Sequence, residues 1–179
     1  GGTGGYITFA GFVKETGRGV VVLTNSGSSN SDDIGIHLLD PQSPLQEVKP
    51  DYSYAIRQMI DKDGPAGLME KYKTLKAENP GKYTLDEDAI NTLGYAYLSQ
   101  EKVEAAKAVF GINVMEFPNS SNAYDSYGEA LMIQGQKEEA IVYYQKSLEL
   151  NPANSNAVAM LAKMGVEVKQ EEIIVEEAL

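Results

Sequence analysis

The sequence holds few residues whose types and spacing could carry out chemistry. One serine and one lysine lie three positions apart in Ser99-Gln-Glu-Lys102, a spacing at which an amine can help to deprotonate a hydroxyl. This segment falls between two predicted helices, so a solvated turn is the favoured interpretation. The chain has no cysteine, and its one histidine is His37. We therefore expect no thiol chemistry, no metal site and no cofactor.

The first five residues, GGTGG, suggest a different kind of site, because glycine-rich loops often bind anions. A phosphate-binding loop needs a strand before the glycines and a helix after them. Here a strand-like run, YITFAGFV, follows the glycines instead. The pattern therefore argues against a phosphate-binding loop.

The elements that must position these residues begin with a β-hairpin. Residues 6–13 and 20–25 are rich in β-branched and aromatic types, and a turn segment with two glycines lies between them. Alternate positions of the first strand are largely apolar on both sides, as in a sheet that helices cover on both faces. A short helix is expected over 31–40, with Ser31 or Asp32 as its cap.

The rest of the chain has a helical period, and it begins after a linker that contains three prolines. Within it, several residues repeat in type or size at a spacing of 34. The pairs are Ile90 and Tyr124, Leu93 and Tyr127, Gly94 and Gly128, Tyr97 and Leu131, Ala106 and Ala140, Phe110 and Tyr144, and Pro118 and Pro152. The glycines allow two helices to approach closely, and the prolines end each second helix. Asn113 departs from the pattern, because Ser147 stands at its equivalent position.

This repeat resembles the tetratricopeptide repeat (TPR) family in period and helix–turn–helix pattern. The resulting fold class is mainly α: a TPR-like α-solenoid of about 2.5 repeats, preceded by a β-hairpin and a helix. The predicted segments are a hairpin and helix (1–40), a linker (41–51), an atypical helical pair (52–86), repeat 1 (87–120), repeat 2 (121–154), a capping helix (155–165) and an acidic tail (166–179).

In this family the first helix of each pair lines the concave face. The resemblance implies a binding groove with these exposed residues: Asp88, Asn91, Tyr95, Asn122, Asp125, Glu129 and Asn156. A groove that clamps a peptide carboxylate needs several Lys or Arg residues, and only Lys163 is available. We therefore expect a basic or amide-rich partner segment. The alternative is a spacer that packs on its own neighbouring domain.

The opening run, GGTGGYITFAGFVKETGRGVVVLTNSG, resembles the third conserved block of serine β-lactamase and penicillin-binding-protein-like hydrolases, closest to the class C-like esterase and peptidase branch. The resemblance implies that Gly1 is the last glycine of the block and that the backbone of Gly2 helps to form an oxyanion hole. Residues 6–40 would then be the last strands and helix of that domain. The nucleophile is expected before residue 1, so the chain as given is expected not to be catalytic. An exported, periplasmic bacterial protein is implied.

The charge of the chain limits the choice of partners. The net charge is −11, with 26 acidic and 15 basic residues, which disfavours nucleic acids and anionic membranes. The expected function is a TPR-type protein-interaction or structural accessory region of a β-lactamase-like serine hydrolase. The alternative is the hydrolase itself, with its nucleophile-bearing part outside this chain. Expected partners are a protein or peptide, its own hydrolase domain, or a second copy paired through the open edge of strand 6–13.

Overall fold

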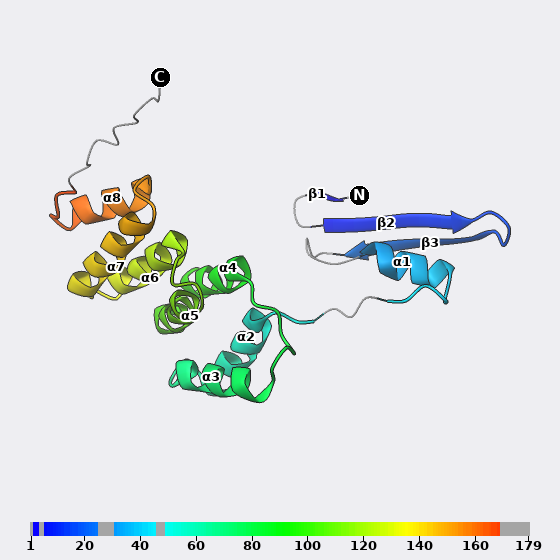
Figure 1. The fold of residues 1–179 in the computed structure, drawn as a ribbon, viewed down its shortest axis with the longest axis horizontal. Helices are drawn as coiled ribbons and strands as arrows, with labels where there is room; N and C mark the ends of the chain where they lie inside the picture. Colours follow the sequence, from blue (N-terminus) through cyan, green and yellow to red (C-terminus); the bar gives the residue numbers. More distant parts are fainter. Residues whose placement is uncertain (1, 4–5, 25–30, 46–48, 169–179) are drawn as a thin grey trace, which may run out of the picture. The chain divides into compact units, whose positions relative to one another are not determined.

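The computed structural model describes residues 2–3, 6–24, 31–45 and 49–168. The chain divides into two compact units, Gly1–Val48 and Lys49–Leu179. Figure 1 labels the strands and helix of the first unit and the helices of the second. Each unit is described by itself below.

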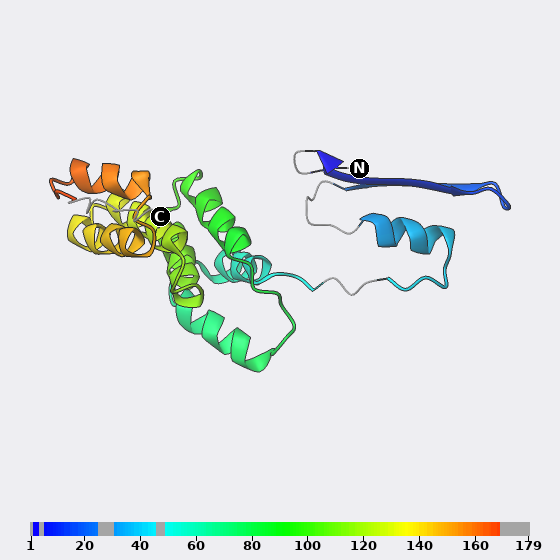
Figure 2. The same cartoon turned by 45° about the horizontal axis from the view of Figure 1, so that its top comes forward.

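The first unit is a small antiparallel sheet with one helix. Its strands β1 (Gly2–Thr3), β2 (Tyr6–Val13) and β3 (Arg18–Thr24) lie in the order β1-β2-β3. The predicted hairpin is thus confirmed, although β3 begins two residues earlier than expected. A further short strand, β1, covers the first residues of the edge of β2. Figure 2 shows helix α1 (Ser31–Leu39) beside the sheet.

Helix α1 covers one face of this sheet at close range. A Cβ atom built at Gly35 would lie 1.9 Å from the Phe9 ring, so only glycine fits there. The expected cap is wrong at Ser31, whose hydroxyl is buried without a hydrogen-bond partner in the described part of the chain. Ser31 instead lies inside the helix as its first residue, with Asp32 after it.

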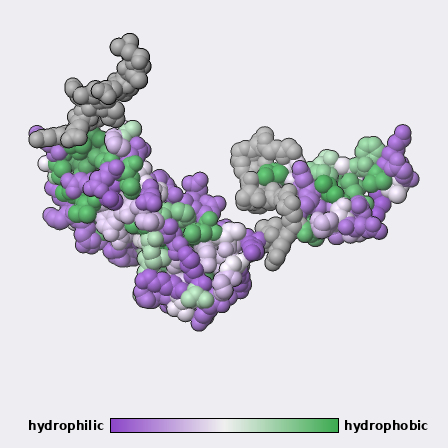
Figure 3. Space-filling model, viewed as in Figure 1, coloured by the Kyte–Doolittle hydropathy of each residue, from purple (hydrophilic) through white to green (hydrophobic). Residues whose placement is uncertain are grey.

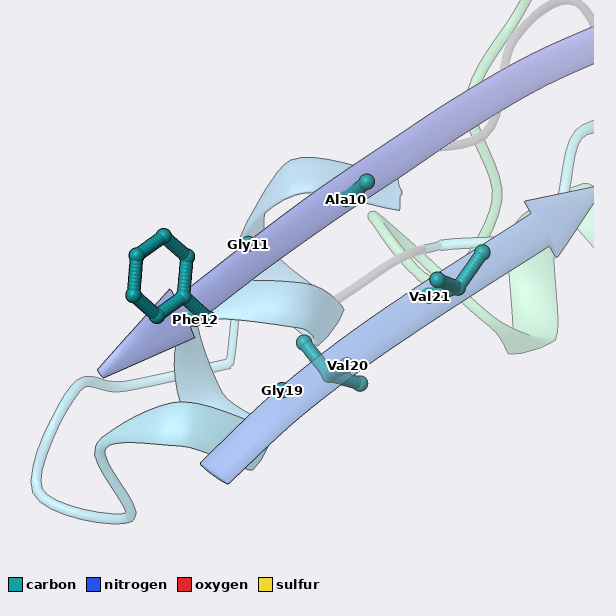
Figure 4. Close-up of a pocket in the computed structure, with 6 residues that line it drawn as sticks. All are labelled: Ala10, Gly11, Phe12, Gly19, Val20 and Val21. Atoms are coloured by element: carbon teal, nitrogen blue, oxygen red, sulfur yellow. The ribbon is translucent and has the colours of Figure 1, made fainter. Parts of the chain in front are cut away.

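The other face of the sheet is apolar and exposed. Phe12 and Leu23 are 72% and 75% exposed, and Val21 is 66% exposed. Figure 3 shows hydrophobic side chains over this unit. Figure 4 shows Phe12 and Val21 at a shallow pocket between β2 and β3, which Ala10 and Gly19 also line. Of the two apolar faces that the alternation predicted, α1 therefore covers one.

The second unit begins with helices α2 (Tyr52–Asp63) and α3 (Leu68–Glu78). The Asp51 carboxylate caps α2 by accepting the backbone N–H groups of Ser53 and Tyr54. Gly64 ends the helix at φ +74°. The buried side chains of these helices join the core beneath the repeats; they include Tyr52, Ile56, Leu68 and Tyr72.

Five further helices complete the second unit: α4 (Glu87–Leu98), α5 (Val103–Glu116), α6 (Ser121–Ile133), α7 (Lys137–Leu150) and α8 (Ser155–Lys163). Helices α4, α6 and α8 begin at residues 87, 121 and 155, 34 residues apart. Their caps Asp86, Ser120 and Asn154 keep the same spacing, and each accepts a backbone N–H. The predicted helical solenoid is confirmed.

The repeated glycines allow close packing, as the sequence predicted. A Cβ atom at Gly94 would lie 2.2 Å from the Phe110 ring, and one at Gly128 would lie 3.2 Å from the Tyr144 ring. At the irregular position of the repeat, the Ser147 hydroxyl donates to the Ser121 carbonyl at 2.8 Å. The equivalent Asn113 is fully buried, and its amide atoms have no partner in the described residues.

Candidate functional site

Polar side chains from the first helices of the repeats meet on one surface. We call this surface, made of Tyr95, Asp125, Glu129, Asn154 and Asn156, the inner face. The Tyr95 hydroxyl of α4 donates to Glu129 Oε2 of α6 at 2.9 Å. This bond spans 34 residues in sequence, so the helical repeat is what brings the two side chains together.

Two asparagines orient the Asp125 carboxylate. Asn154 Nδ2 donates to Asp125 Oδ1 at 2.9 Å, and Asn156 Nδ2 donates to Oδ2 at 2.8 Å. Asn154 is itself fixed, because its side-chain oxygen caps α8. Its amide also donates to the Ser147 hydroxyl at 2.8 Å. The direction of the Asp125 carboxylate is thus set before any ligand arrives.

A second acidic contact lies at the start of the repeats. The Glu87 carboxylate accepts the Ser120 hydroxyl at 2.5 Å and the Asn122 amide at 3.4 Å. Asp88 is exposed beside it. The expectation that Asn91 is open to solvent is wrong for its carbonyl oxygen, which is buried without a partner among the described residues. The neighbouring helices cover that oxygen.

The inner face carries negative charge without a cationic partner. The ion pairs that form in the described residues join other carboxylates: Asp63, Glu70, Glu104, Glu116 and Glu149. Neither Asp125 nor Glu129 has a Lys or Arg within ion-pair distance in the described ranges. The amides and hydroxyl that bind these two carboxylates orient them but leave their charge in place.

Two tyrosines beside these carboxylates are held neutral. Burial, together with the negative charge of Glu129, raises the pKa of Tyr95 to about 12, although its contact with Ser126 acts in the opposite direction. Burial raises the pKa of Tyr144 further, and the charges of Asp125 and Glu129 add to the effect. Both hydroxyls therefore keep their protons at neutral pH and can donate or accept hydrogen bonds.

The residues that suggested catalysis are not brought together. The Ser99 hydroxyl donates to the Ala96 carbonyl, and the Lys102 ammonium donates to Gln100 Oε1. This turn between α4 and α5 therefore holds no serine–lysine pair. Gly2 lies in β1 opposite Ile7, and Gly1 lies outside the described residues.

Two other kinds of site were examined in the described residues. No helix there is long and apolar enough to cross a membrane. No three His, Cys, Asp or Glu side chains in those ranges come together as metal ligands. His37, half-buried in α1, has its Nδ1 atom 2.7 Å from the Ser43 carbonyl and so has a structural contact.

Comparison with known proteins identifies the repeat. Residues 121–154 match a tetratricopeptide repeat. The match covers α6 and α7, so the TPR-type repeat predicted for these helices is confirmed. A search of curated proteins gave no match.

Three of the similar solved structures are also described as follows. The first TPR of Spaghetti (RPAP3) bound to an HSP90 peptide shares 20% identity, with a TM-score of 0.44, covering 63% of this chain and 86% of that chain. The second TPR domain of human RPAP3 in complex with an HSP70 peptide shares 21% identity, with a TM-score of 0.44, covering 63% and 91%. MamA shares 19% identity, with a TM-score of 0.41, covering 68% and 67%.

The sequence analysis missed several residues that build this face. Asn154, Glu87, Ser126 and Tyr144 were not among the predicted groove residues, yet each contacts one of them or lies within its electrostatic reach. A signal for Asn154 was present, because it stands 34 residues after Ser120 in the same capping position. No comparable signal distinguishes the Tyr144 hydroxyl from the ring that packs in its place at Phe110.

Proposed function

We propose that the helical unit is a protein-interaction module that binds an extended peptide segment along the inner face. The observation that carries this proposal is the set of oriented polar side chains on α4, α6 and α8. Tyr95, Asp125 and Asn156 point their hydrogen-bonding groups at one another across consecutive first helices. Such a row of polar groups suits a ligand that runs across several repeats.

The repeat architecture supports a binding role over a purely structural one. Exposed positions of α4 and α6 include large residues, since Tyr95 is 38% exposed. Aromatic side chains with a polar end are typical of protein interfaces. A spacer needs no oriented carboxylate such as that of Asp125, whereas a ligand site benefits from one.

An array of peptides probed with the full chain tests this function. We expect the bound peptides to share a sequence pattern, and we expect Asn156→Ala to weaken their binding, because it frees the Asp125 carboxylate to move. Val142→Ser is the matched control, since Val142 is exposed on the second helix α7. No bound peptides, or equal loss of binding in both variants, would refute the proposal.

A second candidate function concerns the first unit. The sheet order β1-β2-β3, followed by α1 on β2 and β3, agrees with the order of elements that the β-lactamase resemblance implies. We propose that this unit is the end of a serine hydrolase domain whose nucleophile lies outside these 179 residues. None of the proteins named above is a hydrolase by its printed name.

Nitrocefin and p-nitrophenyl esters test this second function. We expect no turnover by these 179 residues, and turnover by a longer natural chain that includes the residues before Gly1. A longer chain without any hydrolytic activity would refute the hydrolase assignment. Turnover by the 179 residues themselves would show that the nucleophile lies within them.

The exposed sheet supports self-association as a further proposed partner mode. Strand β2 is paired along its outer edge only at Tyr6 and Ile7 in the described residues, so its later residues leave backbone groups open. Light scattering on the full chain tests this proposal. We expect a dimer that Phe12→Lys weakens; a monomer at high micromolar concentration would contradict it.

A further inference from the structure

The Tyr144 hydroxyl is a buried polar group that the repeat does not need. Tyr144 is fully buried, and its Oη atom has no hydrogen-bond partner in the described residues. The equivalent position in the first repeat is Phe110, which packs on Gly94 as Tyr144 packs on Gly128. The ring therefore satisfies the packing alone, and a buried hydroxyl without a partner costs stability.

The surroundings of this hydroxyl are acidic. Asp125, Glu129 and Tyr95 all lie within electrostatic reach of Tyr144 Oη. Asp125 and Glu129 are four residues apart on α6, and like charges at this spacing destabilise a helix. No Lys or Arg of the described ranges pairs with either one. Two carboxylates and an unsatisfied hydroxyl thus converge without a cation.

We propose that Asp125, Glu129 and Tyr144 form a pocket that binds one cationic side chain, Lys or Arg, of the partner peptide. This inference rests on the proposed peptide-binding function and names the chemistry of the ligand. An ammonium or guanidinium group donates several hydrogen bonds and accepts none. It would bind the two carboxylates, and the Tyr144 oxygen would accept a further bond. The asparagines that hold Asp125 in place reduce the entropy lost on binding.

A carboxylate clamp is excluded by the same geometry. A ligand carboxylate would lie against two carboxylates, and Lys163 is engaged elsewhere, with its Nζ atom 4.0 Å from the Met160 sulfur. Like charges at close range disfavour binding. The charge of the pocket therefore selects the sign of the ligand.

Small probes test the pocket without requiring a known peptide. N-acetyl-lysine methylamide and N-acetyl-arginine methylamide are titrated into the full chain at constant ionic strength, with N-acetyl-norleucine methylamide as the neutral control. NMR shifts of residues 95, 125, 129 and 144 report binding. We expect a cationic probe to bind about tenfold more tightly than norleucine, as for one charge-assisted hydrogen-bonded pair. The two cationic arms show whether an ammonium or a guanidinium fits better.

Three variants locate the effect. Glu129→Gln and Tyr144→Phe are expected to weaken binding of the cationic probe and leave that of norleucine unchanged. Tyr144→Phe keeps the ring that packs on Gly128, so its fold is retained, and circular dichroism checks this. Glu138→Gln removes an exposed charge of α7 and is expected to have no effect.

The outcomes separate the pocket from the wider function. Equal shifts with all three probes, or no shift at all, would overturn the cation pocket. Peptides from the array that bind equally well with Lys or norleucine would also overturn it, and would leave peptide binding intact. Binding of the lysine probe by a chain that binds no array peptide would refute the proposed function instead.

Discussion

At the scale of single residues, the turn between α4 and α5 contains an avoidable strain. Glu101 has φ +59°, and Gly135, its equivalent 34 residues later, has φ +79°. A side chain in this left-handed region costs about 1 kcal/mol, which glycine avoids. We expect Glu101→Gly to raise the free energy of unfolding by about 1 kcal/mol and Gly135→Glu to lower it by a similar amount. Urea unfolding measures both; a destabilised Glu101→Gly would contradict this account.

The two packed glycines should differ in what they tolerate. A methyl group at Gly94 would clash with the Phe110 ring at 2.2 Å, whereas one at Gly128 would lie 3.2 Å from Tyr144. We expect Gly94→Ala to cost about 2 kcal/mol through overpacking. In Gly128→Ala the better helix propensity of alanine, about 1 kcal/mol, should offset most of the strain. Thermal unfolding of both variants, showing equal losses, would remove the distinction.

At the scale of elements, the caps of the first helices carry unequal loads. Ser120 caps α6 with one backbone hydrogen bond, and its hydroxyl also donates to Glu87. Asn154 caps α8 and binds both Asp125 and Ser147. We expect Asn154→Ala to cost about 2 kcal/mol and Ser120→Ala about 1 kcal/mol. Denaturant unfolding gives the order, and a smaller loss for Asn154→Ala would contradict the network at α8.

The elements also show how far the sequence could be interpreted alone. The spacing of 34 predicted the helices, their caps at Ser120 and their glycine contacts, because a repeat imposes the same geometry on each copy. It could not predict the strain at Glu101 or the open hydroxyl of Tyr144. Both depend on where a side chain departs from its repeat equivalent, and sequence spacing reports only what the repeats share. The additional strand β1 was missed because two residues carry no period.

At the scale of the whole molecule, buried tyrosines should make the chain sensitive to alkali. Burial raises the pKa of Tyr97, Tyr127 and Tyr143, and raises that of Tyr95 to about 12. An unfolded tyrosine ionises near its ordinary pKa of about 10. The stabilisation from neutral Tyr95 is therefore complete below pH 10 and is lost as the pH rises towards 12. We expect tyrosinate absorbance and loss of helical circular dichroism to rise together in this range. Full ionisation with the helices intact would contradict it.

The central claim is that α4, α6 and α8 form a ligand-binding face. The most direct measurement is NMR mapping on the full chain with the tightest peptide from the array. The account predicts that the shifted residues lie on these three helices, centred on Tyr95, Asp125, Glu129 and Asn156, and that replacing the cationic residue of the peptide by norleucine weakens binding about tenfold. Shifts centred on α5 and α7, or on the sheet of the first unit, would contradict the claim.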